Sequence, residues 1–303
     1  MLWRRTFWLA VLIVISGGLT LQAWADESLQ TRQLHVNGVD LSYLDQGTGA
    51  PIVFVHGSFL DFRFWEPQRQ AIAQQYRFIA YNRRYHGTAA WPDTGKDYSA
   101  ATHAADLAAF LRQLHAGPVH LVGHSYGGLL ATLVAIEHPE LLRSVTLAEP
   151  GMGALLTDMP EGKSVLDDRS KAMAPAGEAV KAGDAVQATK LLFDWVANQG
   201  AGAFDKQPEA VRQMILDNAR TVPLLLAAPA PPAVSCATLG GVKASTLIIG
   251  GEQTPRYFSL INEVIVRCIP GSRLVPIPQA THPMSIQNPA AFNEALLQFL
   301  AQH

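Results

Sequence analysis

The chain has 303 residues, which is enough for one sizeable domain or for a core domain that carries an insertion. Its formal net charge is −2 at pH 7, and no long acidic or basic tail is present, so nothing indicates a nucleic-acid partner. With 49% hydrophobic and 16% charged residues, the composition is that of a globular protein.

The first 25 residues have the pattern of an export signal. Arg4 and Arg5 form a positively charged start, residues 7–15 are continuously apolar, and Ala23-Trp24-Ala25 is an A-x-A cleavage site. We therefore predict a signal peptide over residues 1–25 and a periplasmic or secreted mature protein with no stable membrane insertion.

Two alternatives for this N-terminal segment stay open. The apolar stretch could be extended to Leu21, which approaches the length of a retained membrane anchor. Arg4-Arg5-Thr6-Phe7 also resembles a twin-arginine signal, so the route of export is not decided by the sequence.

Cys236 and Cys268 are the two cysteines of the chain. In an oxidising compartment they could form a disulfide, and two buried free thiols are the alternative. Neither has histidine or cysteine neighbours at the spacing of a metal site, so we predict no metal there.

Short apolar strands alternate with helices along most of the chain. Asn37-Gly38 lies between two β-type runs and predicts a type I′ hairpin. Further strands are predicted at 52–55, 77–81, 119–122, 144–148, 246–249 and 273–277, and helices at 62–75, 99–115, 128–138, 256–267 and 289–300. This alternation predicts an α/β fold with a mostly parallel sheet and helices on both faces.

The alternation is interrupted by about 90 residues that lack strand patterns. We predict a core domain from residues 26–150 and 241–303, and a helical cap, rich in Ala, Met and Leu, from residues 151–240. Such a cap would cover the carboxyl edge of the sheet, where open α/β sheets bind their ligands.

The most specific motif is G-x-S-x-G at residues 123–127, between a predicted strand and a predicted helix. In a turn this tight, the flanking glycines permit close backbone approach, and the central serine is exposed at the tip. Ser125 is therefore the candidate nucleophile.

A serine hydroxyl needs a base within hydrogen-bond reach. Among the ten histidines, His282 follows the last predicted strand and lies in a loop downstream of Ser125. This is the chain order nucleophile, acid, histidine that the motif implies, so His282 is the candidate base, with a surface-loop histidine as the alternative.

The oxyanion of an acyl-transfer intermediate needs backbone N–H donors. His56-Gly57 follows the strand at 52–55, so the N–H of Ser58, or alternatively of Phe59, and the N–H of Tyr126 are the candidate donors. His56 itself is interpreted as structural.

Together these segments resemble the α/β-hydrolase superfamily over nearly all of the mature chain. The resemblance rests on His56-Gly57, on the elbow around Ser125, on Thr281-His282-Pro283, and on residues 82–87, which are similar to a D-x-R-G-x-G loop. It implies an eight-stranded sheet, a Ser-His-acid triad, no metal and no cofactor.

The acid departs from the usual pattern of that superfamily. In the turn Gly251-Glu252-Gln253-Thr254, Thr254 occupies the place where the resemblance implies an aspartate. Glu149, at the end of the strand at 144–148, resembles the arrangement of certain haloalkane dehalogenases and is the first candidate acid. Glu252 is the alternative, and a simple loop carboxylate is a third interpretation of Glu149.

We therefore expect a secreted serine hydrolase that cleaves an ester, lactone or related acyl bond of a small apolar substrate. Phe59, Phe62 and Trp65 are the candidate pocket residues. Cofactor-free perhydrolysis or carbon–carbon bond hydrolysis on the same triad is an alternative, and so is a ligand-binding protein without turnover. A serine in place of an aspartate nucleophile argues against dehalogenase or epoxide-hydrolase chemistry.

Overall fold

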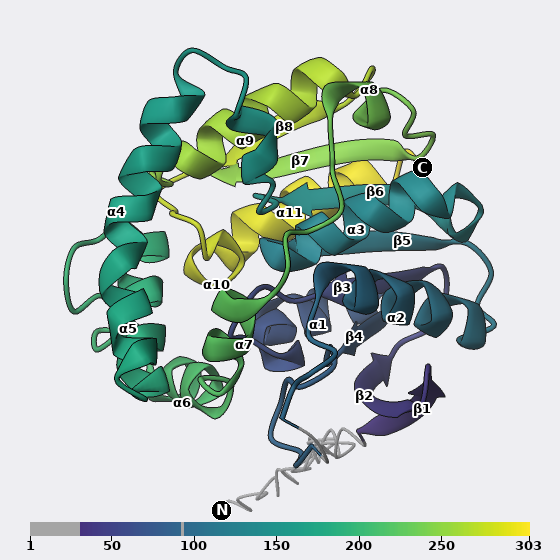
Figure 1. Cartoon of the computed structure of the whole chain (residues 1–303). Coiled ribbons are helices and arrows are strands. Elements are labelled where there is room, and N and C mark those ends of the chain that lie inside the picture. Colours follow the sequence, from purple (N-terminus) through teal and green to yellow (C-terminus); the bar gives the residue numbers. More distant parts are fainter. Residues whose placement is uncertain (1–30, 92–93) are drawn as a thin grey trace, which may run out of the picture. The chain divides into compact units, whose positions relative to one another are not determined.

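A computed structural model describes residues 31–91 and 94–303, so the predicted signal peptide, residues 1–25, lies outside the described part (Figure 1). The sheet begins with the antiparallel hairpin of β1 (Arg32–Val36) and β2 (Val39–Gln46). Asn37 and Gly38 at its tip have φ angles of 45° and 78°, as both central residues of a type I′ turn require.

Within the described part of the chain, the sheet has eight strands in the order β1-β2-β4-β3-β5-β6-β7-β8. The pairs β1–β2 and β2–β4 are antiparallel, and every pair from β4 to β8 is parallel. The remaining strands are β3 (Pro51–Val55), β4 (Arg77–Tyr81), β5 (Val119–His124), β6 (Leu142–Ala148), β7 (Ser245–Gly251) and β8 (Arg273–Ile277). The predicted mostly parallel eight-stranded sheet is confirmed.

Successive residues of a strand point to opposite faces of the sheet. Both faces of this sheet are apolar, and helices cover both of them. On β3, Val53 and Val55 belong to one apolar core and Ile52 and Phe54 to the other. The first core is completed by α2 (Ala100–Gln113), α3 (Tyr126–Glu137) and α9 (Arg256–Cys268), and the second by α1 (Glu66–Ala73) and α11 (Pro289–Leu300). The short elements η2 (Pro139–Leu141) and α10 (Met284–Gln287) complete the core region.

The first of these helices differs from the prediction of one continuous helix at 62–75. A 3₁₀ turn, η1 (Phe62–Trp65), comes first, and the α-helix begins only at Glu66. Pro67 lacks a backbone N–H and is tolerated in the first turn of an α-helix, so it favours a start at this point.

Residues 151–240, called the cap segment below, form helices and loops without a strand, as the sequence pattern predicts. Its elements are η3 (Gly153–Leu156), α4 (Gly162–Lys181), α5 (Ala185–Ala197), α6 (Glu209–Asp217), α7 (Thr221–Ala227) and α8 (Cys236–Leu239). In Figure 1, α4 and α5 lie side by side beyond the carboxyl ends of the strands. None of the helices in residues 31–91 and 94–303 combines the length and apolarity needed to cross a membrane.

A disulfide joins the end of the cap segment to the core. Cys236 opens α8, and Cys268 is the last residue of α9; their Cα atoms are 4.9 Å apart. Of the two alternatives left open by the sequence, the structure shows the disulfide.

We predict that the double variant Cys236→Ser/Cys268→Ser loses about 2–4 kcal/mol of unfolding free energy, because the unfolded chain regains the entropy of a loop of 32 residues. Chemical denaturation of the oxidised protein and of the variant measures this difference. As a control, a reducing agent should lower the stability of the wild type and leave the variant unchanged. Equal stabilities of the two oxidised proteins would contradict the prediction.

Candidate active site

Ser125 lies in a sharp turn at the carboxyl end of β5. Its backbone has φ 55° and ψ −118°, a left-handed conformation that is strained for a residue with a Cβ. Its N–H donates to the carbonyl oxygen of Ala148 on the neighbouring strand at 2.9 Å, which fixes the turn at the sheet edge.

Two glycines allow this turn to form. A Cβ on Gly123 would overlap the carbonyl oxygen of Gly127, and a Cβ on Gly127 would overlap the carbonyl oxygen of Val55. The G-x-S-x-G pattern is therefore required by close backbone approach, both within the turn and between the turn and β3.

His282 and Glu149 form a buried hydrogen-bonded pair beside this turn. Nδ1 of His282 lies 2.7 Å from Oε2 of Glu149, and the two residues are 2% and 0% exposed. Glu149 directly follows β6, with φ 48°, and His282 lies in the loop after β8. The structure thus brings the candidate base and the first candidate acid into contact.

Glu149 also accepts hydrogen bonds from two groups near the end of β7. The N–H of Gly251 donates to Oε1 at 2.7 Å, and the hydroxyl of Thr254 donates to Oε2 at 2.8 Å. Thr254 occupies the place where the family resemblance implies an acid, so this position contributes a donor to the carboxylate of the neighbouring strand.

Glu252, the alternative acid, does not meet His282. Its side chain is exposed, and Oε2 accepts a hydrogen bond from the N–H of Gln279 at 3.0 Å. The two carboxylates named by the sequence analysis are thus distinguished by geometry.

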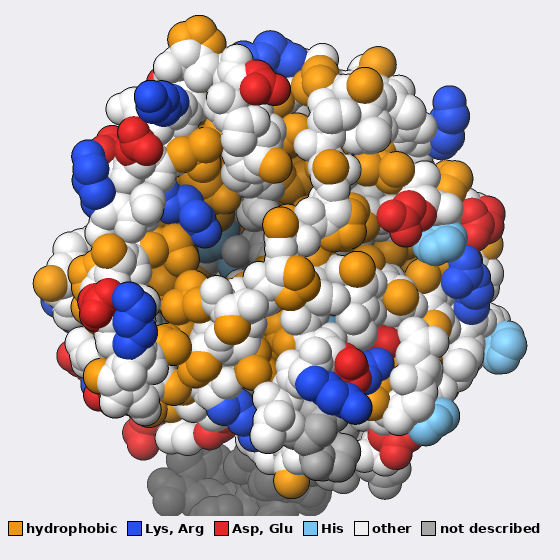
Figure 2. Space-filling model, viewed as in Figure 1, with side chains coloured by type: hydrophobic (Ala, Val, Ile, Leu, Met, Phe, Trp, Pro, Cys, Tyr) orange, Lys and Arg blue, Asp and Glu red, His pale blue; other side chains and the backbone are white. Residues whose placement is uncertain are grey.

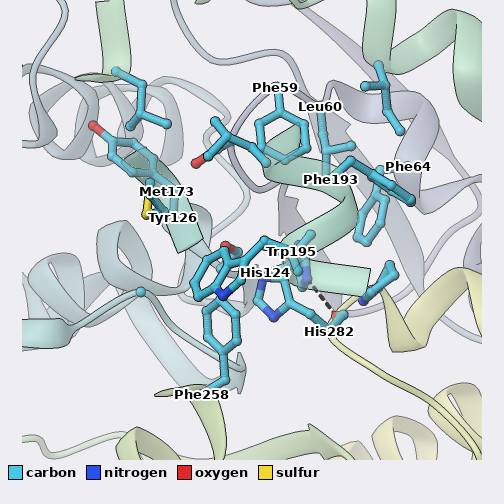
Figure 3. Close-up of a pocket in the computed structure, with 18 of the residues that line it drawn as sticks. Phe59, Leu60, Phe64, His124, Tyr126, Met173, Phe193, Trp195, Phe258 and His282 are labelled. Atoms are coloured by element: carbon cyan, nitrogen blue, oxygen red, sulfur yellow. Dashed lines mark hydrogen bonds between the residues drawn. The ribbon is translucent and has the colours of Figure 1, made fainter. Parts of the chain in front are cut away.

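The imidazole of His282 is enclosed by aromatic rings. Phe258 of α9 stacks on it at 3.7 Å between centroids and 14° between planes, and His124 lies on it at 4.6 Å. Nε2 of His124 donates to the carbonyl oxygen of His282 at 3.0 Å, the bond drawn in Figure 3. Nε2 of His282 has no hydrogen-bond partner among the described residues, and His282 lines the same cavity as Ser125.

Burial sets the protonation of this pair. Removal from water lowers the pKa of His282 to about 3 and raises the pKa of Glu149 to about 8. The hydrogen bonds from Thr254 and Gly251 oppose the rise in the pKa of Glu149, because they stabilise the carboxylate. The imidazole is therefore neutral at pH 7, as a general base must be, whereas Glu149 is mostly ionised only above about pH 8.

The three candidate oxyanion donors lie around Ser125. Ser58, Phe59 and Tyr126 all line the cavity. In the described part of the chain, none of their backbone N–H groups donates a hydrogen bond to another backbone group. Ser58 and Phe59 both remain candidates for the donor from the loop after β3.

Arg83 is a buried residue of this site that the sequence analysis did not single out. It is 1% exposed, and Nη2 donates to the carbonyl oxygen of Gly57 at 2.7 Å. Its guanidinium also lies 4.6 Å from the centre of the Tyr126 ring. The neighbouring Arg84 pairs with buried Asp106 at 2.8 Å, so the sequence shows two adjacent arginines without showing which one faces the site.

A cavity of about 200 Å³ opens above Ser125. Figure 2 shows the hollow, with hydrophobic side chains around it and a basic side chain at its edge. Residues from the cap segment and from the core form its wall. The large side chains labelled in Figure 3 include Phe59, Leu60, Phe64, Tyr126, Met173, Phe193, Trp195 and Phe258.

Of the three pocket residues predicted from the sequence, Phe59 lines this cavity, whereas Phe62 and Trp65 do not. Trp65 is fully buried and packs against Phe54 with ring centroids 5.0 Å apart. The 3₁₀ turn places Phe64, rather than either predicted residue, at the cavity. Within the described residues, no group of three or more His, Cys, Asp or Glu side chains is arranged to hold a metal ion.

Comparison with known proteins agrees with this architecture. The family model described as "alpha/beta hydrolase fold" matches residues 50–289. A 2-(acetamidomethylene)succinate hydrolase of Mesorhizobium japonicum is 31% identical over 121 residues, which are 40% of this chain and 43% of that protein. A putative non-heme bromoperoxidase, BpoC, of Mycobacterium tuberculosis is 25% identical over 276 residues, which cover 87% of this chain and 98% of that protein.

Among solved structures, one described as Est816, an N-acyl homoserine lactone degrading enzyme, superposes with a TM-score of 0.70. It is 26% identical and covers 88% of this chain and 100% of its own.

We predict that Phe258→Ala raises the pKa of His282 from about 3 toward the ordinary value of a histidine, because water reaches the imidazole once the stacked ring is removed. An NMR titration of the imidazole resonances, assigned by comparison with His282→Gln, measures the shift. Phe299→Ala is the control, since Phe299 is also buried and its ring lies tilted against His303 instead. An unchanged titration in Phe258→Ala would contradict the role given to burial.

Proposed function

Because the chain belongs to the α/β-hydrolase family, we propose that it is a serine hydrolase that cleaves an ester, lactone or related acyl bond. The observation that carries the proposal is the buried His282–Glu149 hydrogen bond beside the strained turn of Ser125, in one cavity. The lactone-degrading relative at 26% identity supports the same class of acyl substrate.

In this mechanism Nε2 of His282 removes the proton of the Ser125 hydroxyl as the oxygen attacks the substrate carbonyl. Glu149 accepts a hydrogen bond from the Nδ1–H of the imidazole and stabilises the positive charge that develops on the imidazole. The same proton then passes from His282 to the leaving alkoxide, which leaves an acyl-enzyme on Ser125. Water, deprotonated by His282, attacks the acyl carbon, and the acid is released with Ser125 restored.

The N–H of Tyr126 and the N–H of Ser58 or Phe59 hold the oxyanion. Arg83 strengthens one of these donors. Its guanidinium donates to the carbonyl oxygen of Gly57, which belongs to the same peptide unit as the N–H of Ser58. A cation at one end of a peptide group polarises it, so the N–H at the other end becomes a better donor.

A neutral imidazole and a small apolar cavity suit a small acyl substrate. Cofactor-free perhydrolysis is the second candidate, because a relative over 87% of this chain bears the name non-heme bromoperoxidase. In that reaction hydrogen peroxide replaces water as the second nucleophile, so analysis of the product in the presence of peroxide distinguishes a peracid from the simple acid.

Two features support a periplasmic or secreted location for this hydrolase. The first 25 residues have the pattern of an export signal, and Cys236 pairs with Cys268, a bond that persists in oxidising compartments. N-terminal sequencing of the exported protein tests this location, and a start at Asp26 is the expected result.

We predict that Ser125→Ala abolishes hydrolysis of p-nitrophenyl butyrate and that Glu149→Gln lowers kcat by about 10⁴-fold, since the glutamine cannot stabilise the imidazolium. Single-turnover measurements on the purified variants report these losses. Glu252→Gln is the matched control and should stay within a few-fold of the wild type, because within the described residues its carboxylate accepts a hydrogen bond only from the N–H of Gln279. Full activity in Ser125→Ala, or equal losses in the two glutamate variants, would refute the proposed mechanism.

We predict that Thr254→Val moves the acid limb of the kcat/KM profile to higher pH. The hydroxyl lowers the pKa of Glu149 by stabilising the carboxylate, so its removal raises that pKa. Because the active form needs an ionised Glu149, activity then appears only at a higher pH. Thr254→Ser, which keeps the hydroxyl, should leave the limb in place, and a downward shift in Thr254→Val would count against the assignment.

A further inference from the structure

Arg169 stands out among the side chains that line the cavity. It projects from α4, and it is the only Lys, Arg, Asp or Glu among the described residues that form the wall around Ser125. Its guanidinium lies 5.0 Å from the ring centre of Tyr257 and 5.8 Å from that of Trp195. Both of these rings also line the cavity.

No carboxylate of the described residues balances the charge of Arg169. Among residues 31–91 and 94–303, no carboxylate forms an ion pair with it, and its buried Nε has no hydrogen-bond partner. The two carboxylates that border the adjoining surface hollow are engaged elsewhere: Glu161 pairs with Arg256 at 2.6 Å, and Asp168 with Lys171 at 3.6 Å.

Three lysines of the cap segment have acidic partners, whereas Lys163, Lys206, Arg212 and Arg220, like Arg169, form no ion pair with a carboxylate among the described residues. Lys181 pairs with Glu178 at 2.8 Å, and Lys190 with Asp205 at 3.5 Å. Lys181, Glu178 and Asp205 are exposed and Lys190 is half-buried, so water screens these charges. The one cation that borders the apolar cavity is thus one for which the described chain supplies no counter-ion.

The contacts of Arg169 leave its hydrogen-bonding edge available. A guanidinium that lies against aromatic rings is held by cation–π attraction, and its N–H groups in the plane of the fork remain free to bind two oxygens side by side. A carboxylate matches this fork, and the interaction is stronger beside apolar walls than in open water. Met173, one turn further along α4, also lines the cavity, so this face of the helix is directed toward the cavity.

We propose that Arg169 binds a free carboxylate of the substrate. The natural substrate is then an ester or lactone that carries a carboxylate apart from the acyl group attacked by Ser125. This inference rests on the proposed hydrolase function and narrows it, because it separates anionic from neutral acyl substrates. Arg169 determines specificity, and it takes no part in proton transfer.

Two pairs of substrates test this specificity. Mono-p-nitrophenyl adipate and p-nitrophenyl hexanoate differ by a carboxylate on the acyl side, and 3-carboxyphenyl butyrate and phenyl butyrate differ by one on the leaving-group side. In at least one pair, Arg169→Met should lower kcat/KM for the anionic member by about 10- to 100-fold, the range of a charge-assisted hydrogen bond. The neutral member should change by less than about threefold, and Arg169→Lys should restore part of the loss for the anionic member.

Lys171→Met is the matched control, since it removes one positive charge from the same helix at an exposed position outside the cavity. It should affect the anionic and neutral substrates alike. Equal losses of both members in Arg169→Met would show that the side chain only shapes the wall, and unchanged rates would show that it binds nothing; either result overturns the proposal.

The outcome for the neutral esters separates this inference from the proposed function. If the wild type hydrolyses p-nitrophenyl hexanoate and Ser125→Ala does not, the serine mechanism stands whatever Arg169 does. If neither the neutral nor the anionic ester is hydrolysed, the proposed function itself has failed.

Discussion

The buried carboxylate of Glu149 ties together the carboxyl ends of three neighbouring strands. It follows β6, accepts from Gly251 at the end of β7 and from Thr254 just beyond, and contacts His282 after β8. A carboxylate withdrawn from water is strongly destabilised unless hydrogen bonds replace its hydration. Glu149 can hold His282 only because the ends of these three strands lie close together. The use of Ser125 as a nucleophile depends on this position of His282.

The sequence predicts the sheet and the elbow because both have local causes. Alternation of strands and helices requires a mostly parallel sheet, and the glycines around Ser125 are required by backbone contact. Local sequence does not decide whether Glu149 or Glu252 contacts His282, because this depends on which strand ends lie beside His282 in the folded sheet. Phe62 and Trp65 do not line the cavity, because the aromatic residue that reaches it depends on the 3₁₀ turn formed there in place of the expected helix.

Arg83 shows why burial of a charge cannot be inferred from residue type. Arg84, beside it, has Asp106 as a buried partner, whereas Arg83 has carbonyl oxygens and an aromatic ring, and no carboxylate within the described residues. Such a cation is costly to bury. Arg83 lies behind the Gly57–Ser58 peptide, so the free-energy cost of burying its guanidinium is associated with the active site. Unfavourable local features of this kind are concentrated at functional sites.

Two arginines without acidic partners in the described chain therefore flank the cavity, one behind the oxyanion loop and one in the wall of the cap segment. Both make the potential within an apolar space more positive, and low-dielectric walls extend the reach of that field. In the proposed reaction this positive potential stabilises two negatively charged groups. One is the carboxylate of the bound substrate, and the other is the oxyanion that forms when Ser125 attacks. A neutral His282 suits this arrangement, because a positively charged imidazole would be repelled by the same field before catalysis begins.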